Sequence, residues 1–301
     1  MDNRPQDRMI APAILQALPE RKTDSHKGDF GAAGILGGAA GMTGALLLCA
    51  RAALYLGAGK IYAASVDDMV KLDMQQPELM WLPPHQLPNR KLTVLAVGPG
   101  LGRSEQALEL LAACVHSAAV LVLDADALNL LAATQQLKNG LVLRSSPTLL
   151  TPHPGEAATL LGCDTHTVQR DRISAASRLA ETYRSCVVLK GTGSVCATAD
   201  GEWRINPTGN PGLSAAGTGD VLTGMLAAFL AQGLHPFVAL QLAVYLHGAA
   251  ADSLVEQGIG PIGMTASEVM LEARNLLNGK NRSGRARMRT NLDRNKDTAG
   301  R

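Results

Sequence analysis

A glycine-rich turn and an aspartate at the start of a long apolar run are the residues best suited to chemistry. The turn is Gly217-Thr-Gly219-Asp220, and residues 221–230, which follow it, carry no charge. The first N–H groups of a helix are unpaired and partly positive, so a helix beginning here could bind a phosphate or a developing oxyanion. Asp220, in that first turn, could act as a base or contact a cation. The simpler alternative is that Thr218 or Asp220 only caps the helix.

A second turn with phosphate-binding character follows the apolar run Cys186–Lys190. It consists of Gly191, Thr192, Gly193 and Ser194. Its backbone N–H groups and hydroxyls can bind phosphate oxygens, and Lys190 adds a positive charge. The alternative is an ordinary glycine turn beside a solvated lysine.

A histidine between two prolines follows another apolar run, in the segment Thr151-Pro-His153-Pro-Gly-Glu156. The prolines restrict the backbone on both sides, so His153 is held rigidly at the end of a predicted strand. Most isolated histidines are structural, but one presented in this way is a candidate for ligand binding. Glu156 is explained equally well as a charge in the first turn of a helix.

Glycines at 98, 100 and 102 follow a further apolar run and precede a helical pattern. They resemble part of a dinucleotide-binding fingerprint, but Arg103 stands where a third glycine of that pattern would fall. Asp124 could be mistaken for the ribose-binding acid of such a fold. Asp124 and Asp126 could equally bind a metal ion, or cap the helix that starts near Ala127.

The elements that must position these residues alternate between strand-length apolar runs and helical patterns. The predicted strands are Ala32–Leu36, Lys60–Ser65, Leu92–Val97, Ala119–Leu123, Thr148–Thr151 and Cys186–Lys190, with a hairpin of Val195–Thr198 and Trp203–Ile205 around a two-residue Asp-Gly turn. The predicted helices are Thr43–Leu56, Ser104–Val115, Ala127–Ala133 and Val168–Tyr183, with two more of about 12–15 residues within 221–251, each too short to span a bilayer. Continuously apolar strands interleaved with helices predict an α/β fold with a mostly parallel central sheet covered on both faces. Ligands of such sheets bind beyond the carboxyl ends of the strands, where all the turns above fall.

Composition agrees with this architecture. Of 301 residues, 46% are hydrophobic and 18% charged, which excludes wholesale disorder. Aromatic residues make up only 3%, which argues against a protein that stacks nucleic-acid bases on aromatic rings. Of the 31 glycines, 11 lie in four loops after predicted strands, at 37–44, 98–102, 191–193 and 217–219, where they let the backbone approach a ligand closely.

Three parts of the chain are distinguished by composition: an N-terminal segment (residues 1–25, predicted helical and packed on the core), one domain (26–278) and a basic tail (279–301). Residues 278–301 contain eight Lys or Arg and two Asp without apolar periodicity, so we expect a disordered tail, with weak attraction to RNA or a membrane surface as the alternative. The five cysteines form no C-x-x-C motif, and the polar N-terminus does not resemble a signal peptide. Both features favour a reducing cytoplasm.

Taken together, these segments resemble the ADP/ATP-dependent NAD(P)H-hydrate dehydratases, a branch of the ribokinase-like superfamily. The matching motifs are Lys27-Gly-Asp-Phe-Gly, Met42-Thr-Gly-Ala, Gly98-Pro-Gly-Leu-Gly, Leu123-Asp-Ala-Asp-Ala-Leu-Asn, Thr151-Pro-His-Pro-Gly-Glu, Val188-Leu-Lys-Gly, Asn206-Pro-Thr-Gly-Asn and Gly217-Thr-Gly-Asp. Gly-Thr-Gly-Asp alone indicates only the superfamily. Thr-Pro-His-Pro-Gly-Glu together with Asn-Pro-Thr-Gly-Asn is typical of the dehydratases. One departure is Ala216, where the family usually has a glycine.

The resemblance implies a ribokinase-like three-layer α/β/α fold and a repair reaction. NADH or NADPH that has gained water at C6 of the nicotinamide would be restored by an ADP-dependent dehydration of its S-epimer, releasing AMP and phosphate. The family pattern implies that Ala45, Gly100, His153 and Asp220 contact the hydrated dinucleotide. It implies that Lys190, Gly191, Thr192, Gly193, Ser194 and Gly219 bind the nucleotide. Asp220 would be the base, assisted by the helix N-terminus at Gly217 and Gly219.

The same resemblance implies Mg²⁺ bridging the phosphates, a cytoplasmic location and a homo-oligomer, a tetramer by family pattern. Neither specific nucleic acid nor a membrane is expected as a partner. We expect no epimerase domain, since only a short segment precedes Lys27, so a separate NAD(P)H-hydrate epimerase would be the functional partner. The alternative function is an ATP-dependent kinase of a small hydroxymethyl or vitamin-like substrate, which would share Gly-Thr-Gly-Asp but need not retain His153. A different class is a nucleotide-sensing or RNA-associated protein that uses the basic tail.

Overall fold

The computed structural model describes residues 5–67 and 70–279, and its centre is a nine-stranded sheet. The strand order is β3-β2-β1-β4-β5-β6-β7-β8-β9. The strands are β1 Ala32–Gly37, β2 Lys60–Ser65, β3 Met80–Trp81, β4 Val94–Val97, β5 Val120–Leu123, β6 Thr148–Leu150, β7 Cys186–Leu189, β8 Val195–Ala197 and β9 Trp203–Ile205. Pairing is parallel from β3 to β7, whereas β8 is antiparallel to both of its neighbours. This confirms the predicted mostly parallel α/β sheet.

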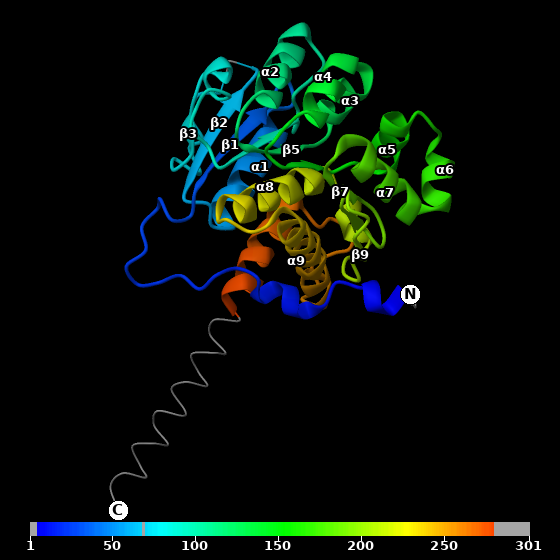
Figure 1. Cartoon of the computed structure of the whole chain (residues 1–301). Helices are drawn as coiled ribbons and strands as arrows, with labels where there is room; N and C mark the ends of the chain where they lie inside the picture. Colours follow the sequence, from blue (N-terminus) through cyan, green and yellow to red (C-terminus); the bar gives the residue numbers. More distant parts are fainter. Residues whose placement is uncertain (1–4, 68–69, 280–301) are drawn as a thin grey trace, which may run out of the picture.

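Helices cover both faces of the sheet, which gives three layers (Figure 1). One face packs against α1 (Thr43–Tyr55), α8 (Thr218–Ala231), α9 (Pro236–Glu256) and a helix over residues 266–279. The other packs against α2 (Glu105–Val115), α3 (Asp126–Ala133), α4 (Gln135–Val142), α5 (Pro154–Leu161) and α7 (Arg172–Tyr183), with α6 (Thr165–Arg170) beside them. Most side chains of the central strands therefore enter one of two apolar cores, as their continuous apolar sequences predict.

The order of the strands reverses at the centre of the sheet. From β1 the chain proceeds outward through β2 to β3, then returns to β4 on the other side of β1 and proceeds outward again. The loops that leave β1 and β4 therefore diverge at the carboxyl edge of the sheet, which is where ligands bind in open α/β folds.

Several predicted boundaries are wrong. The predicted helix Val168–Tyr183 is two helices, α6 and α7, because Asp171 has non-helical backbone angles (φ −143°, ψ 82°) and its carboxylate caps α7 by accepting from the N–H of Ser174 at 2.9 Å. The loop between β8 and β9 is longer than a two-residue turn, since the N–H of Thr198 donates to the carbonyl of Glu202 at 2.9 Å. The short β3 and the helix α4 were not predicted.

Helix α9 has 21 residues, so the predicted length of about 12–15 residues is wrong. Its apolar run ends before Asp252, but the helix continues to Glu256 and ends before Gly258, whose φ is +80°. By length and composition this helix could cross a membrane, and 67% of its most apolar stretch is buried within the protein. Such burial is what a core helix requires.

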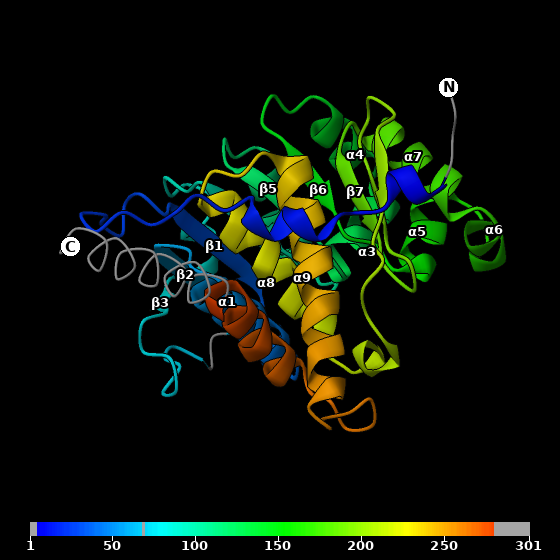
Figure 2. The same ribbon diagram turned by 90° about the horizontal axis from the view of Figure 1, so that it is seen from below.

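The N-terminal segment crosses the face that α8 and α9 cover (Figure 2). It contains two short 3-10 helices, Pro5–Arg8 and Pro12–Gln16. Between them Met9 forms a parallel bridge with Ile205 of β9, and the buried Ile10 donates its N–H to the carbonyl of Ile205 at 2.9 Å. The segment thus covers part of the edge strand. The disorder predicted for the basic tail concerns residues outside the described ranges, apart from residue 279.

Candidate active site

Helix α8 begins with unpaired donors, as its sequence predicts. Gly217 is its N-cap in the left-handed conformation (φ +86°), and a Cβ atom there would lie 2.4 Å from Leu48. Within the described residues, the backbone N–H groups of Thr218, Gly219 and Asp220 have no acceptor. No side chain in the described part of the protein caps the helix, because the hydroxyl of Thr218 donates to the carbonyls of Leu213 and Ala215 instead. The capping alternative is therefore wrong, and the donors are available to an anion.

The turn after β7 is a second group of unpaired donors. No residue in the described ranges accepts a hydrogen bond from the backbone N–H of Gly191, Thr192, Gly193 or Ser194. Gly191 and Gly193 have positive φ values, +132° and +62°. Consecutive free N–H groups in a glycine turn form a concave site for an anion.

Lys190 connects this turn to three carboxyl groups. Its Nζ lies 2.7 Å from Oδ1 of Asp124 and 3.9 Å from Oε2 of Glu156. Burial lowers the pKa of Lys190, but the negative charges of Asp124 and Glu156 outweigh this effect and raise it above its ordinary value. A Cβ atom on Gly219 would lie 3.5 Å from the same Nζ, so the start of α8 faces the lysine. The two groups of free donors therefore meet at Lys190.

Asp220 is the third carboxyl group, and its environment suits a base. Burial, and after it the negative charge of Asp124, raises the pKa of Asp220 from 3.8 to about 7, against the opposing effect of Lys190. A carboxyl group with a pKa near neutrality can both take up and release a proton under physiological conditions.

His153 is the N-cap of α5. Its Nδ1 accepts from the N–H of Gly155 at 3.0 Å, and the buried Glu156 accepts from the N–H of His153 at 2.8 Å, so the two form a capping box. The imidazole is 56% exposed, which leaves it accessible to a ligand. Because the N–H of Lys190 donates to the carbonyl of Pro152 at 2.9 Å, His153 is held next to the Lys190 turn.

Ala45 and Gly100 lie together at the point where the strand order reverses. A Cβ atom on Gly100 would lie 3.3 Å from that of Ala45 and 2.5 Å from the carbonyl oxygen of Met42. The same loop is fixed against β5, since a Cβ atom on Gly98 would lie 1.8 Å from the carbonyl oxygen of Asp124. All the predicted site residues therefore belong to one connected edge of the sheet.

Sequence reasoning missed the partners of Asp124 and Asp126. Asp124 binds Lys190 and accepts from the hydroxyl of Thr223 at 2.8 Å, while Asp126 accepts from the N–H of Gly102 at 3.0 Å. His247 is buried beneath α8: burial lowers its pKa to about 4, partly offset by a hydrogen bond with the backbone of Thr218. Its Nε2 has no partner within the described part of the chain. The position of aspartates directly after β5 was the available signal for the first two.

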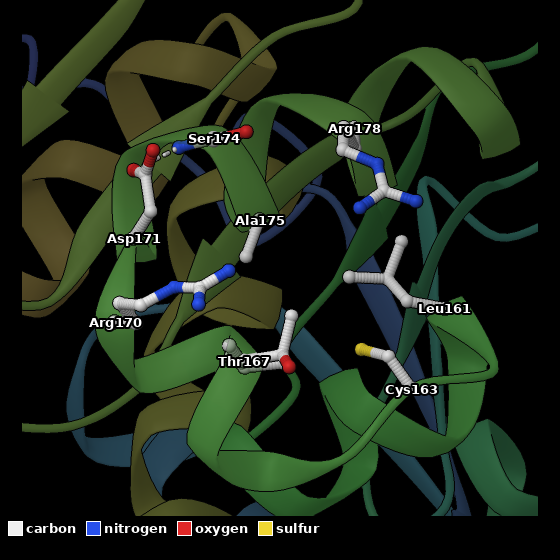
Figure 3. A pocket seen from close by; sticks show the side chains of 9 residues that line it. Leu161, Cys163, Thr167, Arg170, Asp171, Ser174, Ala175 and Arg178 are labelled. Carbon is white, nitrogen blue, oxygen red and sulfur yellow. Dashed lines mark hydrogen bonds between the residues drawn. The ribbon is translucent and has the colours of Figure 1, made fainter.

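A cavity of about 160 Å³ lies outside this edge, between α5, α6 and α7 (Figure 3). The side chains of Arg170 and Arg178 point into it, and Leu161 and Ala175 also line it. None of the predicted site residues lines it.

Comparison with known proteins identifies the family. Residues 33–273 match the family model described as NAD(P)H-hydrate dehydratase. The chain is 41% identical over 272 residues to the ADP-dependent (S)-NAD(P)H-hydrate dehydratase of Neisseria meningitidis, covering 89% of this chain and 90% of that protein. It is 40% identical over 270 residues to the bifunctional NAD(P)H-hydrate repair enzyme Nnr of Moorella thermoacetica, covering 84% of this chain and 50% of the relative. The chain thus spans about half the length of such bifunctional relatives.

A solved structure agrees with the sequence matches. The ADP/ATP-dependent NAD(P)H-hydrate dehydratase of Bacillus subtilis, co-crystallised with ATP and Mg²⁺, superposes with a TM-score of 0.80 at 29% identity, covering 93% of this chain and 99% of that one. The chain therefore belongs to the NAD(P)H-hydrate dehydratase family, within the ribokinase-like α/β fold.

Proposed function

We propose that this chain dehydrates the S-epimer of hydrated NADH or NADPH, with ADP as phosphoryl donor and AMP and phosphate as products. The observation that carries the proposal is the meeting of two groups of free backbone N–H donors at Lys190, beside Asp220 with its pKa of about 7. The names of the Neisseria and Bacillus relatives supply the substrate and the nucleotide.

Asp220 would take the proton from the C6 hydroxyl as its oxygen attacks the terminal phosphoryl group of ADP. The new O–P bond forms while the bond to AMP breaks. Hydroxide is a poor leaving group, whereas phosphate can leave C6 as a proton leaves the neighbouring ring carbon, which restores the double bond. The N–H groups at the start of α8, with Gly217 and Gly219 keeping side chains away, would stabilise the charge on the transferring group.

Lys190 and residues 191–194 would hold the nucleotide. The four N–H groups of the turn suit phosphate oxygens, and Gly219 lies where the transferred group would meet both sets of donors. Ala45, Gly100 and His153 would contact the hydrated dinucleotide. The exposed imidazole of His153 and the small residues Ala45 and Gly100 support this assignment.

Mg²⁺ would neutralise the phosphates during transfer. The described residues contain no group of three or more His, Cys, Asp or Glu that could hold a metal ion by themselves. Mg²⁺ is usually bound by one or two carboxylates together with substrate phosphates, and Asp124 and Glu156 fit that requirement because both reach Lys190 at the site.

We further propose that the protein is located in the cytoplasm and forms a homo-oligomer, with a tetramer as the expected form. We also propose that it cooperates functionally with an NAD(P)H-hydrate epimerase. The last is supported by relatives named as bifunctional repair enzymes, in which this chain matches about half of the protein.

Recovery of absorbance at 340 nm tests the proposal. Hydrated NADH is incubated with the full chain and ADP, ATP or neither, and NADH is measured as it forms. We expect recovery with ADP and Mg²⁺, and none without nucleotide. If neither nucleotide restores the absorbance, the dehydratase assignment is refuted.

A further inference from the structure

Arg172 contacts the backbone of the proposed nucleotide turn at the end of β7. It is the first residue of α7, and its Nη2 donates to the carbonyl oxygens of Leu189 at 3.1 Å and Lys190 at 3.2 Å. Its Nη1 donates to Oε1 of Gln169 in α6 at 2.8 Å. A single planar guanidinium therefore binds two successive peptide groups at the end of β7.

These contacts determine which way the turn presents its donors. The carbonyl of one residue and the N–H of the next belong to one planar trans peptide and point in opposite directions. The carbonyl of Leu189 faces Arg172, and accordingly the N–H of Lys190 points away and donates to Pro152. By the same geometry, the bond from Arg172 to the carbonyl of Lys190 directs the free N–H of Gly191 away from α7.

Gly191 lies in close contact with this guanidinium. A Cβ atom at this position would lie 3.1 Å from Nη1 and 3.2 Å from Nη2 of Arg172, and its φ is +132°. The guanidinium thus lies directly against the backbone of the turn, where only glycine combines this conformation with so close an approach.

Among the described residues, no carboxylate pairs with the charge of Arg172. The side chain is half-buried, burial lowers its pKa, and none of the described residues forms an ion pair with it. Its buried Nε also lacks an acceptor within those residues. A partly desolvated guanidinium without a carboxylate is costly to the fold, but it stabilises an anion bound on the other side of the turn.

We propose that Arg172 is a positioning residue that holds the 190–194 turn in the conformation that presents its free N–H groups to nucleotide phosphates. This rests on the proposed function, because it assumes that the turn binds a nucleotide. Arg172 acts through the carbonyls of Leu189 and Lys190 and contributes its positive charge from behind the turn.

The test measures binding of ADP and ATP with Mg²⁺ by calorimetry, independently of turnover. We expect Arg172→Met to raise the nucleotide Kd about tenfold, which corresponds to about 1.4 kcal/mol. We expect Arg172→Lys to restore little of this affinity, because a single ammonium group cannot reproduce the hydrogen bonds of a planar guanidinium to two successive carbonyls. The matched control is Arg178→Met on the same helix, whose side chain points into the cavity of Figure 3 and whose Kd should stay at the wild-type value.

Further measurements separate positioning from a merely structural role. In the proposed reaction, the KM for nucleotide should rise with the Kd while the KM for the hydrate stays unchanged. Without nucleotide, amide exchange at Lys190 should be faster in Arg172→Met. Should that variant not fold, the exposed Gln169→Leu removes one anchor of the guanidinium and should raise the Kd about twofold.

The two possible failures are distinguishable. Wild-type affinity in a folded Arg172→Met variant, or in Gln169→Leu where only that variant folds, overturns this inference and leaves the proposed function intact. Absence of nucleotide binding in the wild-type protein refutes the proposed function and this inference with it.

Discussion

Replacing Asp220 with asparagine removes the charge of a partly buried carboxyl group while keeping its shape. The folded protein raises the pKa of Asp220 from 3.8 to about 7, chiefly by burial and by the charge of Asp124. Asparagine resembles the protonated form, so the substitution should remove the cost of ionising this site. We expect turnover to be lost, because the base is absent, and nucleotide binding to be largely preserved.

The magnitude follows from the shift. A carboxyl group whose pKa is raised on folding stabilises the folded state below its unfolded pKa, and this contribution is lost as the pH rises through the folded pKa. Raising the pKa of Asp220 from 3.8 to about 7 corresponds to about 4 kcal/mol of free energy. Asp220→Asn should therefore be more stable than the wild type by up to about 4 kcal/mol at pH 8, by about 2 kcal/mol at pH 5, and by almost nothing below pH 4.

Urea unfolding of both proteins at pH 8, 5 and 4 measures these differences, since all other titrating groups are common to the pair. The control is Asp200→Asn in the exposed loop between β8 and β9, which removes a carboxylate without a burial cost. A variant no more stable than the wild type at pH 8, or one equally stabilised at every pH, would refute the electrostatic account of Asp220. An active variant would refute its role as base.

Three further predictions concern the same edge of the sheet. With Asp220 as the base in the free enzyme, kcat/KM should fall about tenfold per pH unit below pH 7, and an acidic limb below pH 5 in a pH–rate profile would contradict this. Lys190→Ala should weaken nucleotide affinity more than kcat in calorimetry and steady-state kinetics, whereas unchanged affinity would leave Lys190 without a binding role. Gly98→Ala should lower the Tm by several degrees, because its Cβ would lie 1.8 Å from the carbonyl oxygen of Asp124 at a φ of +132°. Gly44→Ala, with open space around its Cβ, is the control, and an equal Tm for both variants would contradict the packing argument.

Local patterns predicted the elements that depend on local sequence. Strands such as β1 and β5 are continuously apolar because both faces are buried, and their runs were recognised almost to the residue. The division of α6 from α7 at Asp171 was missed because no proline or glycine marks it; the only signal is an aspartate that caps the next helix. The two-residue β3 was missed because its pairing with β2 at the sheet edge, rather than an apolar run, defines it.

Contacts between distant segments were beyond local patterns. Asp124 and Lys190 lie 66 residues apart, and only the parallel arrangement of β5, β6 and β7 brings the ends of their strands together. The motif order indicated which turns form the site. The motif order did not indicate that Asp124, buried at the end of β5, has two effects. It binds Lys190, and its negative charge also raises the pKa of Asp220.

The charge balance of this cluster constrains how it can bind a nucleotide. Asp124, Glu156 and Asp220 share one lysine, so full ionisation of the three acids would leave excess negative charge, and the pKa values of Glu156 and Asp220 are both raised. Polyphosphates add further negative charge. They are stabilised here only if positive groups face them, and the free N–H groups of the two turns, with Arg172 behind one of them, lie at the same edge. A divalent cation beside Asp124 and Glu156 would remove the remaining repulsion, which is the physical reason to expect nucleotide and Mg²⁺ to bind together.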